Sequence, residues 1–125
     1  MAKHKILIVD DEIGFTRLLK LNLETTGEYE VRIENGGARA YIVAKEFKPD
    51  MILLDVIMPD KDGGEVAAEL SDDPQFKHTP IVFLTAVVSK EEADAKNGII
   101  GSYPFLAKPV SVETVRECIR KNLSR

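Results

Sequence analysis

Residues 49–64 read PDMILLDVIMPDKDGG, an apolar run that ends in an aspartate and is followed by a loop rich in Asp, Pro and Gly. The four consecutive apolar residues Met51–Leu54 are typical of a strand that is buried on both faces of a parallel sheet. Asp55 stands where this strand is expected to end. The next residues carry the Pro, Asp and Gly that turns favour, which predicts a loop up to Gly64.

Four other short apolar runs flank this central one and predict a sheet of five strands. The five runs are Lys5–Val9, Tyr29–Ile33, Met51–Leu54, Ile81–Leu84 and Phe105–Ala107. Tyr29–Ile33 is the exception in its pattern, because apolar and charged residues alternate along it. A strand with one polar face is expected at an edge of the sheet.

Helical patterns separate the runs. They are expected around Phe15, Leu18 and Leu19 up to Gly27, from Ala38 to before Pro49, over Gly64–Leu70, from the Ser89 capping box to near Asn97-Gly98, and from Ser111 to Leu123. The order is therefore (βα) repeated five times. Short right-handed crossovers close such a chain into a doubly wound α/β fold with a five-stranded parallel sheet.

Length and composition limit the class of protein. The 125 residues fit one domain over 1–125, and 44% hydrophobic with 30% charged residues is ordinary for a globular protein. A net charge of −4 argues against direct nucleic-acid binding, and no apolar run is long enough to span a membrane. The single cysteine, Cys118, cannot form an intramolecular disulfide and is interpreted as a packing residue, which favours a cytoplasmic location. His4 and His78 are interpreted as surface residues.

Polar side chains follow four of the predicted strands, at the points where the strands end. They are Asp10-Asp11-Glu12, Asp55, Thr85 and Lys108. Because ligands of open parallel sheets bind beyond the carboxyl ends of the strands, we expect these groups to meet. Packed carboxylates repel one another unless a cation lies between them, and their hard oxygens suit Mg²⁺.

Such a site favours phosphoryl chemistry. Asp55 is the best-placed nucleophile, with Thr85 and Lys108 as partners of the phosphoryl oxygens. Each residue alone has an ordinary structural interpretation. The acidic run can favour a helix N-terminus, Asp55 and Thr85 can cap turns, and Lys108 can be solvated. Only their joint arrival at one sheet edge points to a site.

With these residues identified, the chain resembles the receiver domains of bacterial two-component response regulators, a flavodoxin-like fold. The matching segments are 6–12, 49–64, 80–86, Gly101-Ser102 and 105–109, in the family's order and spacing. The resemblance covers essentially the whole chain.

The resemblance implies a role for each site residue. Asp55 matches the phosphoacceptor, and Asp10, Asp11, Asp55 and the main-chain carbonyl of Ile57 match the Mg²⁺ ligands. Thr85 and Lys108 match the residues that bind the phosphoryl group, and Lys108-Pro109 is expected to be cis. Thr85 and Phe105 match the switch pair, which would reshape the surface of the fourth helix, fifth strand and fifth helix.

The implied partners are a sensor histidine kinase or phosphotransfer protein and a downstream effector, with a possible homodimer on phosphorylation. No membrane contact is implied. A receiver catalyses only its own phosphorylation and dephosphorylation, so the chain is not expected to be an enzyme with an external substrate.

Some positions depart from the family's usual pattern. Phe105 replaces a common tyrosine, and Tyr103 and Pro104 precede it where small or acidic residues are common. Ile57 and Val87 are apolar, and we hypothesise that they shield an acyl phosphate from water. The segment 97–101 predicts a loop in which Ile99 and Ile100 either pack inward or form part of a partner surface.

Three other functions were weighed against this one. A haloacid-dehalogenase-type phosphatase would need a second aspartate at position 57, which is Ile57 here. A dinucleotide or flavin site would need a Gly-rich turn where Asp10-Asp11-Glu12 stands. A receiver-like fold that binds proteins without phosphorylation is the third alternative, although no site residue is missing.

Overall fold

The computed structural model describes residues 3–86, 99–100 and 103–123. The described strands are β1 (His4–Val9), β2 (Tyr29–Glu34), β3 (Met51–Asp55), β4 (Ile81–Thr85), β5 (Ile99–Ile100) and β6 (Tyr103–Ala107). The described helices are α1 (Ile13–Thr25), α2 (Ala40–Phe47), α3 (Gly63–Ser71) and α5 (Val112–Leu123), with short 3₁₀ turns η1 (Gly37–Arg39) and η2 (Pro74–Phe76). The predicted fourth helix, 89–97, lies outside the described residues, as do Val87 and Gly101-Ser102.

The sheet has the strand order β2-β1-β3-β4-β6-β5, and its first five strands run parallel. The predicted five-stranded parallel sheet is therefore confirmed, with β2 at an edge as its alternating pattern indicated. The loop prediction for Ile99 and Ile100 is wrong: these residues form β5, which pairs antiparallel with β6. A two-residue strand is too short to leave a periodic signal in the sequence.

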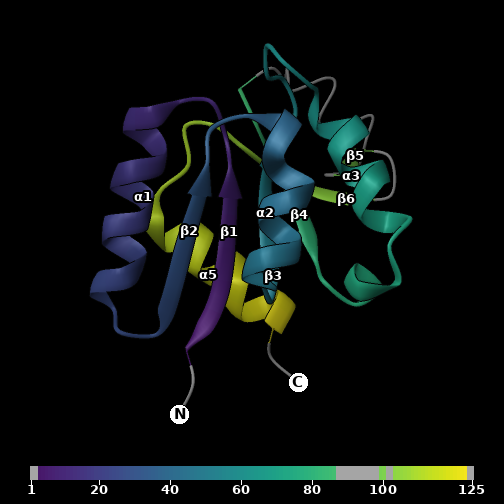
Figure 1. Cartoon of the computed structure of the whole chain (residues 1–125). Helices are drawn as coiled ribbons and strands as arrows, with labels where there is room; N and C mark the ends of the chain where they lie inside the picture. Colours follow the sequence, from purple (N-terminus) through teal and green to yellow (C-terminus); the bar gives the residue numbers. More distant parts are fainter. Residues whose placement is uncertain (1–2, 87–98, 101–102, 124–125) are drawn as a thin grey trace.

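Helices cover both faces of the sheet (Figure 1). One buried cluster joins β1, β3 and β4 to α2 and α3, and the other joins the opposite faces of these strands to α1 and α5. All five residues of β3 are buried, which explains why its sequence is continuously apolar up to Asp55. This burial on both faces fixes the end of β3, and with it the position of Asp55.

The helix boundaries differ from the sequence prediction in local ways. Of the three apolar residues expected to anchor α1, Leu19 is buried and Phe15 packs against the core, whereas Leu18 is 60% exposed. The second helical segment begins as η1 and continues as α2. Lys48 follows the end of α2 in the left-handed conformation (φ 55°), directly before Pro49. The third helix begins one residue earlier than predicted, with the Asp62 carboxylate accepting a hydrogen bond from the Glu65 amide at 2.9 Å.

The carboxyl ends of the parallel strands meet at one edge of the sheet, and the chain termini lie at the opposite end (Figure 1). In the described part of the chain, no helix is long and apolar enough to cross a membrane.

Candidate functional site

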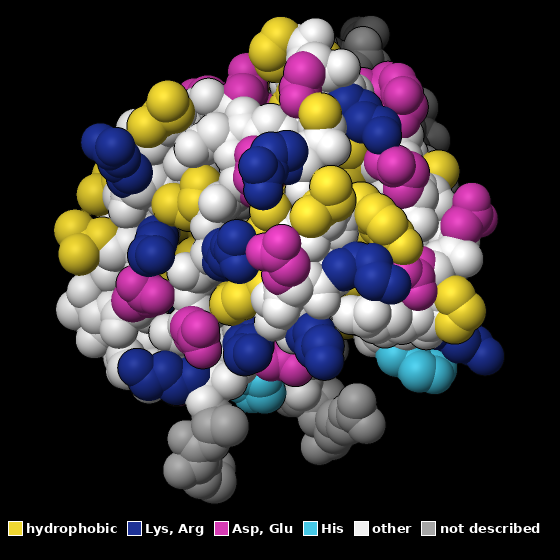
Figure 2. Space-filling model, in the orientation of Figure 1, with side chains coloured by type: hydrophobic (Ala, Val, Ile, Leu, Met, Phe, Trp, Pro, Cys, Tyr) yellow, Lys and Arg dark blue, Asp and Glu magenta, His cyan; other side chains and the backbone are white. Residues whose placement is uncertain are grey.

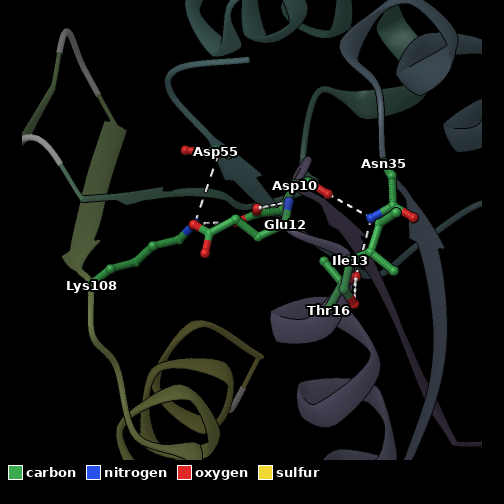
Figure 3. Close-up of polar contacts among 7 residues, drawn as sticks. All are labelled: Asp10, Glu12, Ile13, Thr16, Asn35, Asp55 and Lys108. Carbon is green, nitrogen blue, oxygen red and sulfur yellow. Dashed lines mark hydrogen bonds and ion pairs between the residues drawn. The ribbon is translucent and has the colours of Figure 1, made fainter. Parts of the chain in front are cut away.

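The predicted polar residues lie together at the carboxyl edge of the sheet. Asp10 follows β1, Asp55 ends β3, Thr85 ends β4, and Lys108 follows β6. One carboxylate oxygen each from Asp10, Asp11 and Asp55 can be chosen so that all three lie within 4.8 Å of one another. Figure 3 shows the Lys108 side chain reaching across from β6 toward Asp10 and Asp55.

Burial makes this acidic cluster electrostatically costly. Asp10 is fully buried and Asp55 is 5% exposed. Desolvation, reinforced by the nearby Asp10 charge, raises the pKa of Asp55 to about 7, although Lys108 works against this. Desolvation also raises the pKa of Asp10. The site therefore disfavours the simultaneous charging of its carboxylates when no cation other than Lys108 is near.

Lys108 places a positive charge beside the acidic cluster. Its Nζ lies 2.6 Å from Asp10 Oδ2, 2.7 Å from Glu12 Oε1 and 3.8 Å from Asp55 Oδ2. Burial works to lower the pKa of Lys108, but the contacts with Asp10 and Glu12 outweigh it and the net shift is upward. The lysine is therefore held in its charged form within reach of Asp55.

The donor set of this cluster fits a divalent cation. Asp10 Oδ2 is buried and lies 2.6 Å from Lys108 Nζ, and the Asp10, Asp11 and Asp55 carboxylates converge on the same point. Carboxylates packed this closely repel one another, and a further cation among them relieves the repulsion. Mg²⁺ prefers hard oxygen ligands and takes only one or two carboxylates directly, so Asp10, Asp11 and Asp55 form a suitable set.

Three further predicted residues lie on or just after the strands β3, β4 and β6. Thr85 is buried at the end of β4, and its main-chain carbonyl accepts a hydrogen bond from the Lys108 amide at 2.8 Å. Ile57 follows Asp55 by two residues, and its side chain is 57% exposed. Phe105 lies on β6 and is partly buried against the hydrophobic core cluster that includes α2 and α3. The Lys108-Pro109 peptide bond is cis, as predicted.

Three further residues at this edge, Glu12, Phe15 and Asn35, also take part in the contacts around Asp10 and Lys108. Glu12 accepts a hydrogen bond from Lys108 Nζ at 2.7 Å, and Lys108 Nζ lies 4.7 Å from the centroid of the Phe15 ring. Asn35 Nδ2 donates to the Asp10 main-chain carbonyl at 2.7 Å and lies 3.1 Å from Thr16 Oγ1 (Figure 3). Asn35 follows β2 directly. It is therefore also a polar residue at the end of a strand, the feature that predicted the other site residues.

Asp60 fixes the loop beyond Asp55 to the rest of the site. Its two carboxylate oxygens accept hydrogen bonds from the Gly37 amide at 3.1 Å and the Ala38 amide at 2.9 Å. The hydrogen bond from the Ala38 amide, followed by the one from the Gly37 amide, lowers the pKa of Asp60. The β3–α3 loop is thereby tied to η1, which stands at the start of the α2 segment.

A doubly wound parallel sheet with an acidic cluster and a lysine at its carboxyl edge defines a CheY-like receiver fold. The chemotaxis response regulator CheY4 of Vibrio cholerae superposes with a TM-score of 0.83 at 30% identity, over 98% of this chain and 100% of that one. The BeF3-activated receiver domain of Klebsiella pneumoniae RstA superposes with a TM-score of 0.80 at 28% identity, over 98% and 100%.

The family model described as the response regulator receiver domain matches residues 6–120, and this chain belongs to that family. The chain is 32% identical to the polar-differentiation response regulator DivK of Brucella anthropi over 98% of both chains. It is 41% identical to the response regulator PleD of Caulobacter vibrioides over 85% of this chain, but it spans only 23% of PleD. It spans 49% of the PhoP regulator of Bacillus subtilis, at 39% identity.

Membership of the family establishes a signalling role in a two-component system. Receiver domains are generally Mg²⁺-dependent signalling domains. The partners of response regulators are in general histidine kinases and effectors. The phosphatase and nucleotide-binding alternatives lose their support. The roles of the individual site residues stay predictions.

Proposed function

We propose that this chain, residues 1–125, is a single receiver domain that accepts a phosphoryl group on Asp55 and uses it to control a partner. The observation that carries the proposal is the cluster of three carboxylates at the carboxyl edge of the sheet, two of which, Asp10 and Asp55, form ion pairs with the buried Lys108. Asp55 ends the fully buried strand β3, its pKa is raised to about 7 by desolvation, and its Oδ2 lies 3.8 Å from Lys108 Nζ.

The transfer forms one bond and breaks one. An Asp55 oxygen bonds to phosphorus while the P–N bond of a phosphohistidine donor breaks, and the imidazole leaves with the electron pair and takes a proton. Asp10, Asp11, Asp55 and the Ile57 carbonyl would hold Mg²⁺, which when bound neutralises charge on the phosphoryl oxygens. Lys108 and the Thr85 hydroxyl bind the remaining oxygens. Attack by water later returns Asp55 to its carboxylate and releases inorganic phosphate.

The switch runs from Thr85 to Phe105. A Thr85 hydroxyl drawn toward the phosphoryl group leaves space beside β6, and Phe105 turns into it. Tyr103 and Phe105 lie against the same core cluster, and the Tyr103 ring meets Phe83 edge-on at 5.6 Å. The surface of β6, α5 and the predicted fourth helix then changes shape and selects the partner.

The partners that follow from this function are a sensor histidine kinase or phosphotransfer protein and a downstream effector. Homodimerisation on phosphorylation and a cytoplasmic location belong to the same proposal. The net charge of −4 supports an output through protein contact and not through direct nucleic-acid binding.

Incubation with acetyl phosphate and Mg²⁺ is expected to add one phosphoryl group to the folded protein, because the site brings a nucleophile and its charge partners together. Intact-mass spectrometry and Phos-tag electrophoresis measure the uptake, and peptide mapping after borohydride trapping locates it at Asp55. Chelation with EDTA is the control and should prevent uptake. A protein that stays unmodified with Mg²⁺ present would instead support the platform that binds proteins without phosphorylation.

Ile57→Asn is expected to shorten the lifetime of the phosphorylated state severalfold. Ile57 follows Asp55 by two residues and its apolar side chain is 57% exposed, so it is expected to hinder an attacking water, whereas an amide there can hydrogen-bond that water. Loss of phosphate after removal of the donor, followed on Phos-tag gels, measures the rate. Ile42→Asn replaces an isoleucine of similar exposure (53%) on α2 and serves as control. Equal lifetimes in all three proteins would remove the shielding hypothesis.

A further inference from the structure

The Lys108 ammonium is shared unequally among its neighbours. Its Nζ lies 2.6 Å from the buried Asp10 Oδ2 and donates a hydrogen bond to Glu12 Oε1 at 2.7 Å, whereas Asp55 Oδ2 lies 3.8 Å away. The Phe15 ring covers another side of the ammonium, at 4.7 Å from its centroid. The ammonium thus lies nearer to the acidic run after β1 than to Asp55 (Figure 3).

The contact with Glu12 is suited to being released. The Glu12 side chain is 58% exposed, while the Lys108 side chain is only 8% exposed. Exposed carboxylates form weak ion pairs because water competes for them. A phosphoryl dianion bonded to Asp55 would offer a stronger charge-assisted hydrogen bond, at the cost of moving the ammonium by about 1 Å. Glu12 and Phe15 also border a cavity of about 280 Å³ beside Lys108, so this side of the ammonium is not closely packed.

We propose that Glu12 is a positioning residue that, together with Asp10, holds the Lys108 ammonium away from Asp55 in the resting protein, and that Glu12 is the exposed partner that releases the ammonium when the phosphoryl group arrives. Glu12 therefore weakens the phosphorylated state by competing for the lysine. This role rests on the proposed function of Asp55. It predicts that removing the Glu12 charge strengthens the binding of a phosphoryl group, the opposite of what loss of a direct phosphoryl or metal contact would do.

The first experiment observes the resting protein without any phosphoryl group. The Phe15 ring current should shift the Lys108 Hε and Cε signals upfield in ¹³C-lysine spectra, with assignment by their loss in Lys108→Arg. In Glu12→Gln these signals should move, because the ammonium loses one of its two close charged partners and shifts relative to the ring. Glu46→Gln is the matched control, since Glu46 is 55% exposed and forms its ion pair with Arg32 and not with Lys108. Unchanged Lys108 signals in Glu12→Gln would overturn the proposal.

The second experiment measures the affinity for beryllofluoride, an analogue of the phosphoryl group, at saturating Mg²⁺. Glu12→Gln is expected to bind about two- to fivefold more tightly than the wild type, the range that an exposed ion pair supports, and Glu46→Gln is expected to match the wild type. Equal or weaker binding by Glu12→Gln would contradict the proposal. Binding by the wild-type protein tests the proposed function separately, so the two ideas fail on different measurements.

Discussion

Asp55→Asn is expected to abolish phosphate uptake and, in the absence of metal, to stabilise the fold by roughly 2–4 kcal/mol at pH 8. Uptake is lost because an amide is not a nucleophile of this kind. The gain in stability arises because the folded protein raises the pKa of Asp55 from 3.8 to about 7, through desolvation first and the Asp10 charge second. A neutral amide of the same shape avoids that cost.

The stability difference should depend on pH in a defined window. Because the pKa of Asp55 is higher in the folded than in the unfolded chain, the native state binds the extra proton between about pH 4 and pH 7. Wild-type stability should therefore fall as pH rises through this window and level off above it. The advantage of Asp55→Asn should be close to zero at pH 4 and full by pH 8. Urea unfolding in EDTA at several pH values measures both curves.

Asp72→Asn is the control for removing one negative charge. Asp72 is exposed at the end of α3, so its replacement should change stability by less than ~0.5 kcal/mol and without that pH profile. Added Mg²⁺ should stabilise the wild type more than Asp55→Asn, since the metal neutralises the charge that the variant lacks. Parallel pH curves for the wild type and Asp55→Asn would show that the acidic cluster imposes no cost on the fold.

Strands and their ends could be predicted from the sequence because burial on both faces leaves a direct mark. β3 is apolar at every position until Asp55, and the parallel arrangement then brings the ends of β1, β3, β4 and β6 to one edge. The approximate location of the site follows from this pattern alone. Helix faces were less secure, as exposed Leu18 shows, because apolar residues also occur on surfaces.

The pairing inside the site could not be predicted in the same way. Lys108 Nζ lies 2.6 Å from Asp10 Oδ2 and 2.7 Å from Glu12 Oε1 but 3.8 Å from Asp55 Oδ2, so about 1 Å separates the close partners from the distant one. Spacing along the chain does not contain such differences. The hydrogen bonds of Asp60 to Gly37 and Ala38 join segments 22 and 23 residues apart, so local turn rules also could not find them.

Gly63→Ala is expected to destabilise the protein by about 1–3 kcal/mol or more and to displace the Asp55 backbone. A Cβ at position 63 would lie 2.2 Å from the Asp55 carbonyl oxygen and 2.9 Å from the Val56 Cα. These atoms belong to the main chain, so no side-chain rotation relieves the overlap. The Gly63 amide also donates to the Val56 carbonyl at 2.7 Å, a bond that holds the start of α3 against the end of β3. Urea unfolding and acetyl-phosphate uptake should therefore both be impaired.

Gly14→Ala separates this steric effect from the general effect of adding a methyl group. Gly14 lies in the first turn of α1, and an added Cβ there would meet nothing within 4 Å. Because alanine restricts the unfolded chain and favours helix, this variant should be more stable by roughly 0.5–1 kcal/mol, with normal phosphate uptake. Opposite signs for the two glycines are the expected signature of the close packing of α3 on β3. If Gly63→Ala were as stable and as readily phosphorylated as the wild type, that packing could not be what fixes the position of Asp55.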